Sequence, residues 1–311
     1  MNRWRRHIWL IFAFAALFLA LRPGASIAAQ RAGTAKSDAI SLGLVSETSQ
    51  KEIEEHFREF ARYAAKRLSS ATATEGRVVV APGPLQLAKL LEEKKVDFYM
   101  ESPYPTYLIN KQGAAVLILR RWKGGLAEYR SLIITKRDSG VSRLEDFRGK
   151  MIAFEDPGST SGYFLPKVML LKKGFRLKEK SGLAAKVSPG EVGYVFGSTD
   201  RNVVNLVLAK RVAAGAVSSD DHATLDEKIR SDVAILAETE PFPRHLVSVR
   251  KDLPPAVTKR LKEILLSMDH DDEGRKILHR IDNTTKFDLL PGGEPMVRRK
   301  LVELFRPRGK N

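Results

Sequence analysis

Three consecutive hydroxyl side chains stand at the start of an apolar-periodic segment. Residues 154–171 read FEDPGSTSGYFLPKVMLL, where a strand pattern passes through a glycine-flanked turn into a helical pattern. The first amides of a helix lack intrahelical acceptors and the helix dipole is positive there, so Ser159, Thr160 and Ser161 could add hydroxyl donors to an oxyanion site. An ordinary N-cap, in which one hydroxyl accepts from a helix amide, explains the same residues. The segment alone leaves both interpretations open.

The same segment superficially resembles the G-x-S-x-G nucleophile elbow of serine hydrolases. In GSTSG the central residue is Thr160, where the nucleophilic serine would stand. A hydrolase would also need a base near Ser159 or Ser161, and the sequence offers no obvious one. We therefore predict a binding protein without catalytic residues rather than an enzyme.

A second stretch, MDHDDEG at residues 268–274, has the carboxylates of a metal site. Extending the calcium-loop template places Arg280 where a bidentate Glu is required, so a solvated acidic helix start is the better interpretation. The chain has no cysteine, which excludes zinc-thiolate sites, cysteine nucleophiles and lipid attachment through an N-terminal Cys. We predict neither a metal nor a cofactor.

The N-terminal residues have the pattern of a secretory signal peptide. Arg3, Arg5 and Arg6 precede an apolar run from Ile8 to Leu21, and small residues follow up to Ala28. The run is shorter than the roughly 20 residues that span a bilayer, which favours cleavage near Ala28 over an uncleaved anchor. We predict a signal peptide at residues 1–29 and an exported protein.

The formal net charge of +16 suits anionic ligands, nucleic acid or an acidic membrane surface. Acidic and basic residues alternate along stretches such as KEIEEHFREFARYAAKR at residues 51–67, and no nucleic-acid-binding module is recognisable. We therefore expect a small anionic ligand and no nucleic acid.

Strand and helix patterns alternate along most of the chain, which is typical of an α/β fold built on parallel sheet. Residues 49–70 carry apolar side chains at helical spacing, between strand patterns at 39–47 and 76–82. Residues 96–110 predict a strand that runs into a proline-rich loop. The alternation then repeats from the strand pattern at 151–156 onward. Two similar halves joined by strands predict two lobes, and small ligands usually bind in the cleft between lobes.

One of the six histidines lies in a suggestive place. His245 follows Arg244 in PFPRH, within a crossover between two strand patterns at residues 233–252. A structural or solvated histidine is the simpler interpretation, but a His–Arg pair near an inter-lobe cleft could bind an anion.

Four stretches, in this order, are similar to the phosphate/phosphite/phosphonate-binding proteins of ABC transporters. They are VDFYMESPYPTYL, YRSLIITKRDSGVSRLEDFRGKMIAFEDPGSTSGYFLPKVMLLKKG, GYVFGSTDRNVVNLVLAKRVAAGAV and ETEPFPRHLVSVRKDLP. The resemblance implies a type II periplasmic-binding-protein fold, with two α/β lobes, two crossover strands and a ligand cleft that closes by hinge motion. It divides the chain into lobe I, residues 36–131 plus 239–311, and lobe II, residues 132–238.

The resemblance also implies a function and site residues. It indicates a periplasmic, monomeric solute-binding protein that delivers an oxyanion to an inner-membrane ABC permease. The hydroxyl row matches the Ser-Thr-Ser that grips the phosphorus oxyanion in that family. The full set of predicted ligand-binding residues is Ser159, Thr160, Ser161, Tyr104, Tyr107, Thr199, Arg244 and His245. Tyr104 or Tyr107 matches the place where an aromatic or small polar residue closes the pocket from the other lobe, and Tyr129 is a weaker candidate.

The chain departs from the family pattern at three places, one of which is the crossover, where the family often has an acidic residue after its proline and this chain reads PFPRH. Thr199 stands where the family often has a ligand-contacting His, and Ala213 stands where an acidic residue is common. A ligand with an amino group would need carboxylate partners, so these changes argue against an aminoalkylphosphonate. Arg244 and His245 favour a purely anionic ligand. A degenerate homologue acting as a sensor or accessory protein, with a different small anionic ligand, is the alternative.

Overall fold

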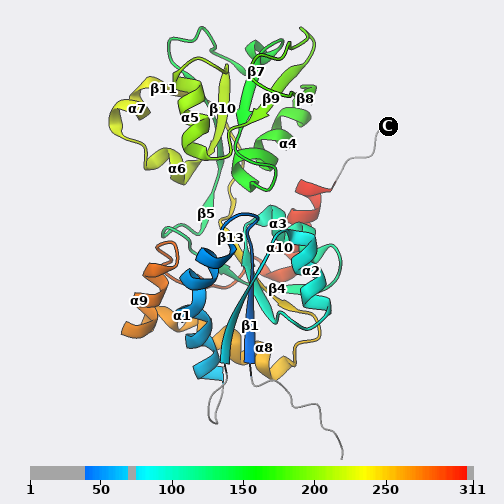
Figure 1. Ribbon diagram of the computed structural model, residues 1–311, viewed down its shortest axis with the longest axis vertical. Helices are drawn as coiled ribbons and strands as arrows, with labels where there is room; N and C mark the ends of the chain where they lie inside the picture. The colour runs from blue at the N-terminus through cyan, green and yellow to red at the C-terminus, as the bar shows by residue number, and fades with distance from the viewer. Residues whose placement is uncertain (1–38, 69–74, 307–311) are drawn as a thin grey trace, which may run out of the picture. The chain divides into compact units, whose positions relative to one another are not determined.

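The computed structural model describes residues 39–68 and 75–306. The predicted signal peptide therefore lies outside the described residues. The described chain forms two six-stranded sheets and one two-stranded sheet (Figure 1). The first sheet takes strands from both ends of the chain, and the second takes its strands from the middle.

The first sheet has the strand order β14-β4-β13-β3-β1-β2. Its strands are β1 (Ala39–Val45), β2 (Glu75–Ala81), β3 (Phe98–Glu101), β4 (Ala115–Arg121), β13 (His245–Arg250) and β14 (Phe287–Asp288). β1 pairs in parallel with both β2 and β3. Five of its seven residues are buried, as expected for a parallel strand covered on both faces. This confirms the predicted strand at 39–47.

Helices cover both faces of the first sheet. They are α1 (Gln50–Leu68), α2 (Pro84–Glu92), α3 (Pro103–Asn110), α8 (Pro255–Leu266), the 3₁₀ turn η3 (Met268–His270), α9 (Asp272–Arg280) and α10 (Gly293–Phe305). α1 buries Phe57, Phe60 and Ala64 against one face, in a core shared with α8 and α9. α2 packs closely on the other face, since a Cβ at Gly43 of β1 would lie 2.6 Å from Leu87 Cδ1.

The second sheet has the strand order β11-β6-β10-β7-β9-β8. Its strands are β6 (Ser131–Lys136), β7 (Met151–Phe154), β8 (Leu177–Glu179), β9 (Val192–Phe196), β10 (Ala214–Ser218) and β11 (Val233–Glu238). The helical segments are η1 (Leu144–Phe147), η2 (Thr160–Phe164), α4 (Leu165–Lys172), α5 (Asp200–Leu208), α6 (Ser219–Ala223) and α7 (Glu227–Asp232). β7 pairs in parallel with β9 and β10. Their carboxyl ends therefore meet at one edge, where η2, α5 and α6 begin.

Two strand connections join the lobes. β5 (Glu128–Tyr129) leads into β6, and β11 leads into β12 (Phe242–Pro243) and β13. β5 and β12 pair antiparallel with each other, with Phe242 opposite Tyr129. The chain thus crosses between the two larger sheets twice, on adjacent strands.

One local prediction was wrong. The proline-rich residues after β3 form the helix α3 rather than a loop. Pro103 stands at the first helical position, where a missing amide hydrogen costs nothing and the fixed φ of proline suits the helix. Tyr104 and Tyr107 are therefore helix residues.

The acidic stretch at residues 268–274 begins a helix. Asp271 is the N-cap of α9, and its side chain accepts from the Gly274 amide at 2.7 Å. Within residues 39–68 and 75–306 no group of three or more His, Asp and Glu side chains is arranged to hold a metal ion.

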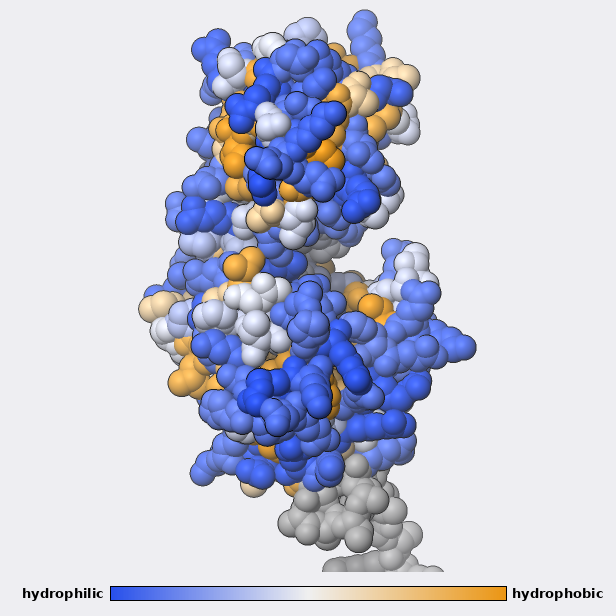
Figure 2. Space-filling model, turned by 90° about the vertical axis from the view of Figure 1, so that its left-hand side faces the viewer, coloured by the Kyte–Doolittle hydropathy of each residue, from blue (hydrophilic) through white to orange (hydrophobic). Residues whose placement is uncertain are grey.

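The described surface is mainly hydrophilic. On the face shown in Figure 2, apolar residues gather only in small groups among hydrophilic ones. Over the described ranges, no helix combines the length and apolar character needed to cross a membrane.

Candidate functional site

The hydroxyl row lies at the start of a π turn. Phe164 N–H donates to Ser159 C=O at 3.1 Å, five residues apart, and α4 follows directly. Pro166 explains this geometry, because it has no amide hydrogen for the Gly162 carbonyl that an α-helix would pair with it. That carbonyl accepts instead from the Glu155 amide, at 3.1 Å. Such π turns are frequent at functional sites.

Ser159 is both an N-cap and a hydrogen-bond donor. Its Oγ accepts from the Gly162 amide at 2.9 Å and donates to Glu155 Oε2 at 2.6 Å. The simple N-cap interpretation therefore holds for Ser159, whose hydroxyl hydrogen goes to a carboxylate. The sequence offered no obvious base near this serine, and Glu155 corrects that expectation. Burial raises the pKa of Glu155 from 4.5 to about 7, although the hydrogen bond from Ser159 lowers it.

Thr160 is in contact with the other lobe. It is 2% exposed, and its Oγ1 accepts from the Tyr104 amide at 2.9 Å. The same oxygen lies 3.0 Å from Ser102 Oγ, at the start of α3. Tyr104 also stacks its ring on Phe164, which follows the hydroxyl row. The structure thus brings Tyr104 and the hydroxyl row together across the boundary between the lobes.

Tyr107 has a different environment. It is buried in an apolar cluster with Leu117, Leu246 and Phe305, and its ring packs against Phe305 at a centroid distance of 5.7 Å. It lies on the same helix as Tyr104, three residues further along, where it helps fix α3 to α10. Of the two tyrosines predicted as alternatives, Tyr104 is the one in contact with the hydroxyl row.

Arg244 and Tyr129 form a second wall beside the hydroxyl row. The Arg244 guanidinium lies over the Tyr129 ring, 4.5 Å from its centroid. Burial raises the pKa of Tyr129 to about 12, and Arg244 and the hydroxyls of Thr160 and Ser161 oppose that rise. These influences mean that Tyr129 lies close to both the hydroxyl row and the guanidinium. Tyr129, the weaker candidate from the sequence, therefore lies next to Thr160 and Ser161.

The Arg244 side chain also binds a carboxylate of the other lobe. Its Nε donates to Asp220 Oδ2 at 2.8 Å, and both side chains are largely buried. Asp220 lies on α6, at the sheet edge where the hydroxyl row begins. The sequence-based argument considered Thr199, which stands in place of a histidine, and Ala213, which stands in place of an acid. It missed that Asp220 supplies a carboxylate to this edge.

His245 is surrounded by cationic side chains. Burial lowers its pKa well below the ordinary value, and Lys123, Arg121 and Arg244 lower it further. The imidazole is therefore neutral at physiological pH. Its Nδ1 is buried and has no hydrogen-bond partner within residues 39–68 and 75–306. Lys123 and Arg121 both contact Asp282, at 3.5 and 2.9 Å.

Two of the departures from the family pattern, Thr199 and Ala213, have different positions in the structure. Thr199 is exposed and caps α5, accepting from the Asn202 amide at 3.2 Å. Ala213 precedes β10, and its amide donates to the carbonyl of Met151 at the first residue of β7. It therefore lies at the amino ends of the strands, roughly 16 Å along β10 from the opposite edge. An acid at residue 213 would not reach the hydroxyl row, so its absence does not weaken this site.

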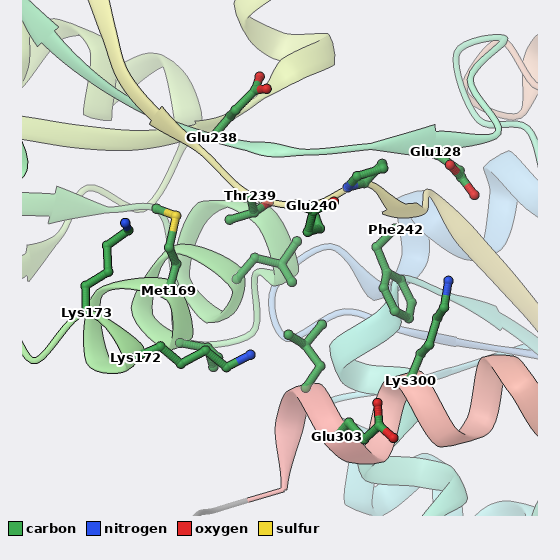
Figure 3. Close-up of a pocket in the computed structure, with 14 residues that line it drawn as sticks. Glu128, Met169, Lys172, Lys173, Glu238, Thr239, Glu240, Phe242, Lys300 and Glu303 are labelled. Atoms are coloured by element: carbon green, nitrogen blue, oxygen red, sulfur yellow. The ribbon is translucent and has the colours of Figure 1, made fainter.

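A separate cavity lies beside the strand connection. Its volume is about 690 Å³, and Figure 3 shows Lys172 from α4, Lys173 directly after that helix, and Lys300 and Glu303 from α10 around it. The segment from Glu238 to Phe242 forms another wall. None of the eight predicted ligand-binding residues lines this cavity.

Sequence reasoning missed Asp220, Glu155 and Ser102. A usable signal existed for all three, because each directly follows or lies close to the carboxyl end of a parallel strand, where ligands of open α/β sheets bind. Ser102 has the same relation to β3. Its contact with Thr160 joins residues 58 positions apart, and no local pattern encodes it.

Comparison with known proteins agrees with this geometry. A sequence profile of the family described as "ABC transporter, phosphonate, periplasmic substrate-binding protein" matches residues 42–290. The chain belongs to this family. Proteins of this family are periplasmic substrate-binding components of transporters, and the resemblance noted from the sequence is confirmed.

Two relatives have about the same sequence identity to this chain but differ in how much of it they match. The chain is 29% identical over 143 residues to the phosphate-import protein PhnD of Mycolicibacterium smegmatis, a match that spans 45% of this chain and only 44% of the relative. The structure of XAC2383 from Xanthomonas citri bound to ATP is 29% identical, with a TM-score of 0.77 over 86% of this chain and 96% of that one.

PhnD1 from Prochlorococcus marinus, solved in complex with methylphosphonate, shares the fold. It is 15% identical, with a TM-score of 0.62 over 86% of this chain and 98% of that one. These neighbours confirm the two-lobe type II periplasmic-binding-protein fold.

Proposed function

We propose that this chain is the substrate-binding protein of an ABC importer and captures a small phosphorus oxyanion between its lobes. The observation that carries the proposal is the contact of Thr160 with Ser102 Oγ and the Tyr104 amide. Thr160 lies on one lobe and these two partners lie on the other. An oxyanion bound there would touch both lobes and stabilise the closed arrangement.

The donors around the row suit an oxyanion. Helix-start amides, the hydroxyls of Thr160 and Ser161 and the phenol of Tyr129 all offer hydrogen, and Arg244 adds a positive charge. We propose lobe I as residues 36–131 plus 239–311 and lobe II as residues 132–238, with a hinge in the two strand connections. His245 and Thr199 stay candidate ligand contacts, for a ligand that extends beyond the hydroxyl row.

Further parts of the proposal concern partners and export. The relative from M. smegmatis is named as a phosphate-import protein, which supports delivery of the ligand to an inner-membrane permease. We propose export through cleavage near Ala28, a monomeric state, and no role in nucleic-acid binding. The protein would bind its ligand without turnover, since the Ser159 hydroxyl serves as the helix cap.

Replacing Ser159, Thr160 and Ser161 together by alanine tests the site. The triple variant should keep its circular dichroism spectrum and lose oxyanion binding in calorimetry. A thermal-shift screen of the mature protein against phosphate, phosphite, sulfate, phosphonates and small carboxylates identifies the ligand class. A ligand at a hundredfold excess over its Kd raises stability by about 2.7 kcal/mol. Unchanged affinity in the triple variant, or shifts with carboxylates alone, would contradict the proposal.

A sensor or accessory role with another anionic ligand is the second candidate. The observation in its favour is that XAC2383, which matches over 96% of its own length, is bound to ATP. ATP therefore belongs in the same screen. A melt shifted by ATP and not by small oxyanions would favour this candidate, and release of phosphate during the assay would indicate an enzyme instead.

A further inference from the structure

The site contains a buried hydrogen-bond acceptor as well as donors. Asp220 Oδ2 accepts from Arg244 Nε, but the other oxygen, Oδ1, is buried and has no partner within residues 39–68 and 75–306. Buried polar atoms without partners are rare, and each costs free energy. This oxygen needs a donor that the described side chains do not supply.

Tyr129, over whose ring the Arg244 guanidinium lies, carries a second buried atom without a partner among the described residues. Tyr129 is 2% exposed, and its hydroxyl likewise lacks a partner in the described part of the chain. The negative charge of Asp220 raises the pKa of Tyr129, while the hydroxyls of Thr160 and Ser161 lower it. The phenol is thus within electrostatic reach of both the carboxylate and the hydroxyl row. Asp220 Oδ1 and Tyr129 Oη together offer one acceptor and one donor.

From these contacts we infer that Asp220 is a specificity residue, and that the site selects oxyanions that carry their own hydrogen on oxygen. The inference rests on the proposed oxyanion function. An ionised carboxylate repels an oxyanion unless a hydrogen lies between the two oxygens. Hydrogen phosphate and the phosphonate monoanion have a P–OH group that can donate to Asp220 Oδ1. Sulfate has no such hydrogen at neutral pH.

Arg244 makes this discrimination possible. Its Nε donates to Asp220 Oδ2 at 2.8 Å, which holds the carboxylate in place and leaves Oδ1 as the oxygen that can accept from a ligand. The hydroxyl row and Tyr129 donate to the other ligand oxygens. A dianion without hydrogen would accept from those donors, but one of its oxygens would face Asp220 Oδ1 with no hydrogen between the two atoms.

Calorimetry at pH 7 on the mature protein tests the inference, with phosphate, methylphosphonate and sulfate as ligands. The wild type should bind phosphate about 10- to 100-fold more tightly than sulfate, the range expected for one mismatched charged hydrogen bond. Asp220→Asn replaces the acceptor by an amide that donates to sulfate, so it should bind sulfate more tightly and lose most of the preference. Asp221→Asn is the matched control, since it removes the adjacent charge and leaves the Arg244 pair intact.

A measurement on the wild type alone covers the case in which Asp220→Asn does not fold. Fluorophosphate has nearly the shape of phosphate but is fully ionised at pH 7, so it should bind as weakly as sulfate. Equal affinity for phosphate and fluorophosphate, or an unchanged preference in folded Asp220→Asn, would overturn this inference and leave the proposed function standing. If no oxyanion binds the wild type, the proposed function and this inference both fall. If only amino-bearing phosphonates bind, Asp220 recognises an ammonium group and the inference is wrong.

Discussion

Replacing Glu155 by glutamine should remove a pH-dependent loss of stability. Burial raises the pKa of this carboxyl from 4.5 to about 7, and the charges of Asp156, Asp221 and Asp200 add to the rise. Because the folded-state pKa lies above the unfolded one, folding favours the protonated form. The associated stability is fully present below pH 4.5 and is lost as the pH rises through 7.

The two pKa values set the magnitude. Their difference is worth about 3.4 kcal/mol at pH values well above 7, and about 2.5 kcal/mol of that is lost between pH 5 and pH 8. Glutamine at residue 155 does not ionise and can still accept the Ser159 hydrogen through its amide oxygen. The free energy of unfolding of Glu155→Gln should therefore gain about 2.5 kcal/mol relative to the wild type over this range.

Urea unfolding of the variant and the wild type at pH 5 and at pH 8 measures how much unfolding free energy each protein loses between these pH values. Glu92→Gln, at the exposed end of α2, is the control and should follow the wild type at both pH values. If Glu155→Gln and the wild type lose the same stability between pH 5 and pH 8, the carboxyl is not held in its protonated form by folding. The account in which burial of Glu155 outweighs the hydrogen bond from Ser159 and raises the pKa of this carboxyl would then be refuted.

Other predictions concern the donors and the scaffold. Tyr129→Phe removes a buried hydroxyl without a partner, so the ligand-free protein should be as stable as the wild type or about 1 kcal/mol more stable, while oxyanion affinity falls by about tenfold in calorimetry. Gly76→Ala places a Cβ 2.2 Å from the Ala61 carbonyl of α1 and should lower the unfolding free energy by about 1–3 kcal/mol without changing oxyanion affinity. Gly182→Ala, with nothing within 4 Å, is its control and should stay within about 0.5 kcal/mol of the wild type.

The fold class could be read from the sequence because its signals are local. Apolar periodicity placed β1 and α1, and the alternation of strands and helices gave the α/β class. The helix at residues 103–110 has no such local signal, because a proline-rich stretch favours a loop, although Pro103 stands at a helical position that suits proline. The position of Tyr107 depended on that helix, and it faces an apolar cluster instead of the hydroxyl row.

The sequence could predict site residues that are neighbours along the chain, but not contacts between residues far apart in it. The hydroxyl row has a sequence signature because its residues are consecutive, and the adjacent Arg244 and His245 stand out in the predicted crossover. Asp220 lies 24 residues from Arg244, on the other side of the strand connection, and their contact exists only in the folded chain. Ala213 shows the opposite error, since a position chosen by comparison with a family lies at the wrong edge of its sheet.

The carboxylates at this edge explain how a donor-rich site could discriminate among oxyanions. Donors alone bind any tetrahedral anion of the right size, so hydroxyls and amides give affinity with little selectivity. Adding an acceptor penalises every anion that lacks a hydrogen to share. Asp220 and Arg244 lie on opposite sides of the lobe boundary, so the acceptor is held in place only while the lobes are together. Selection would then take place as the lobes close, when the ligand has already met the hydroxyl row and must still fit the carboxylate.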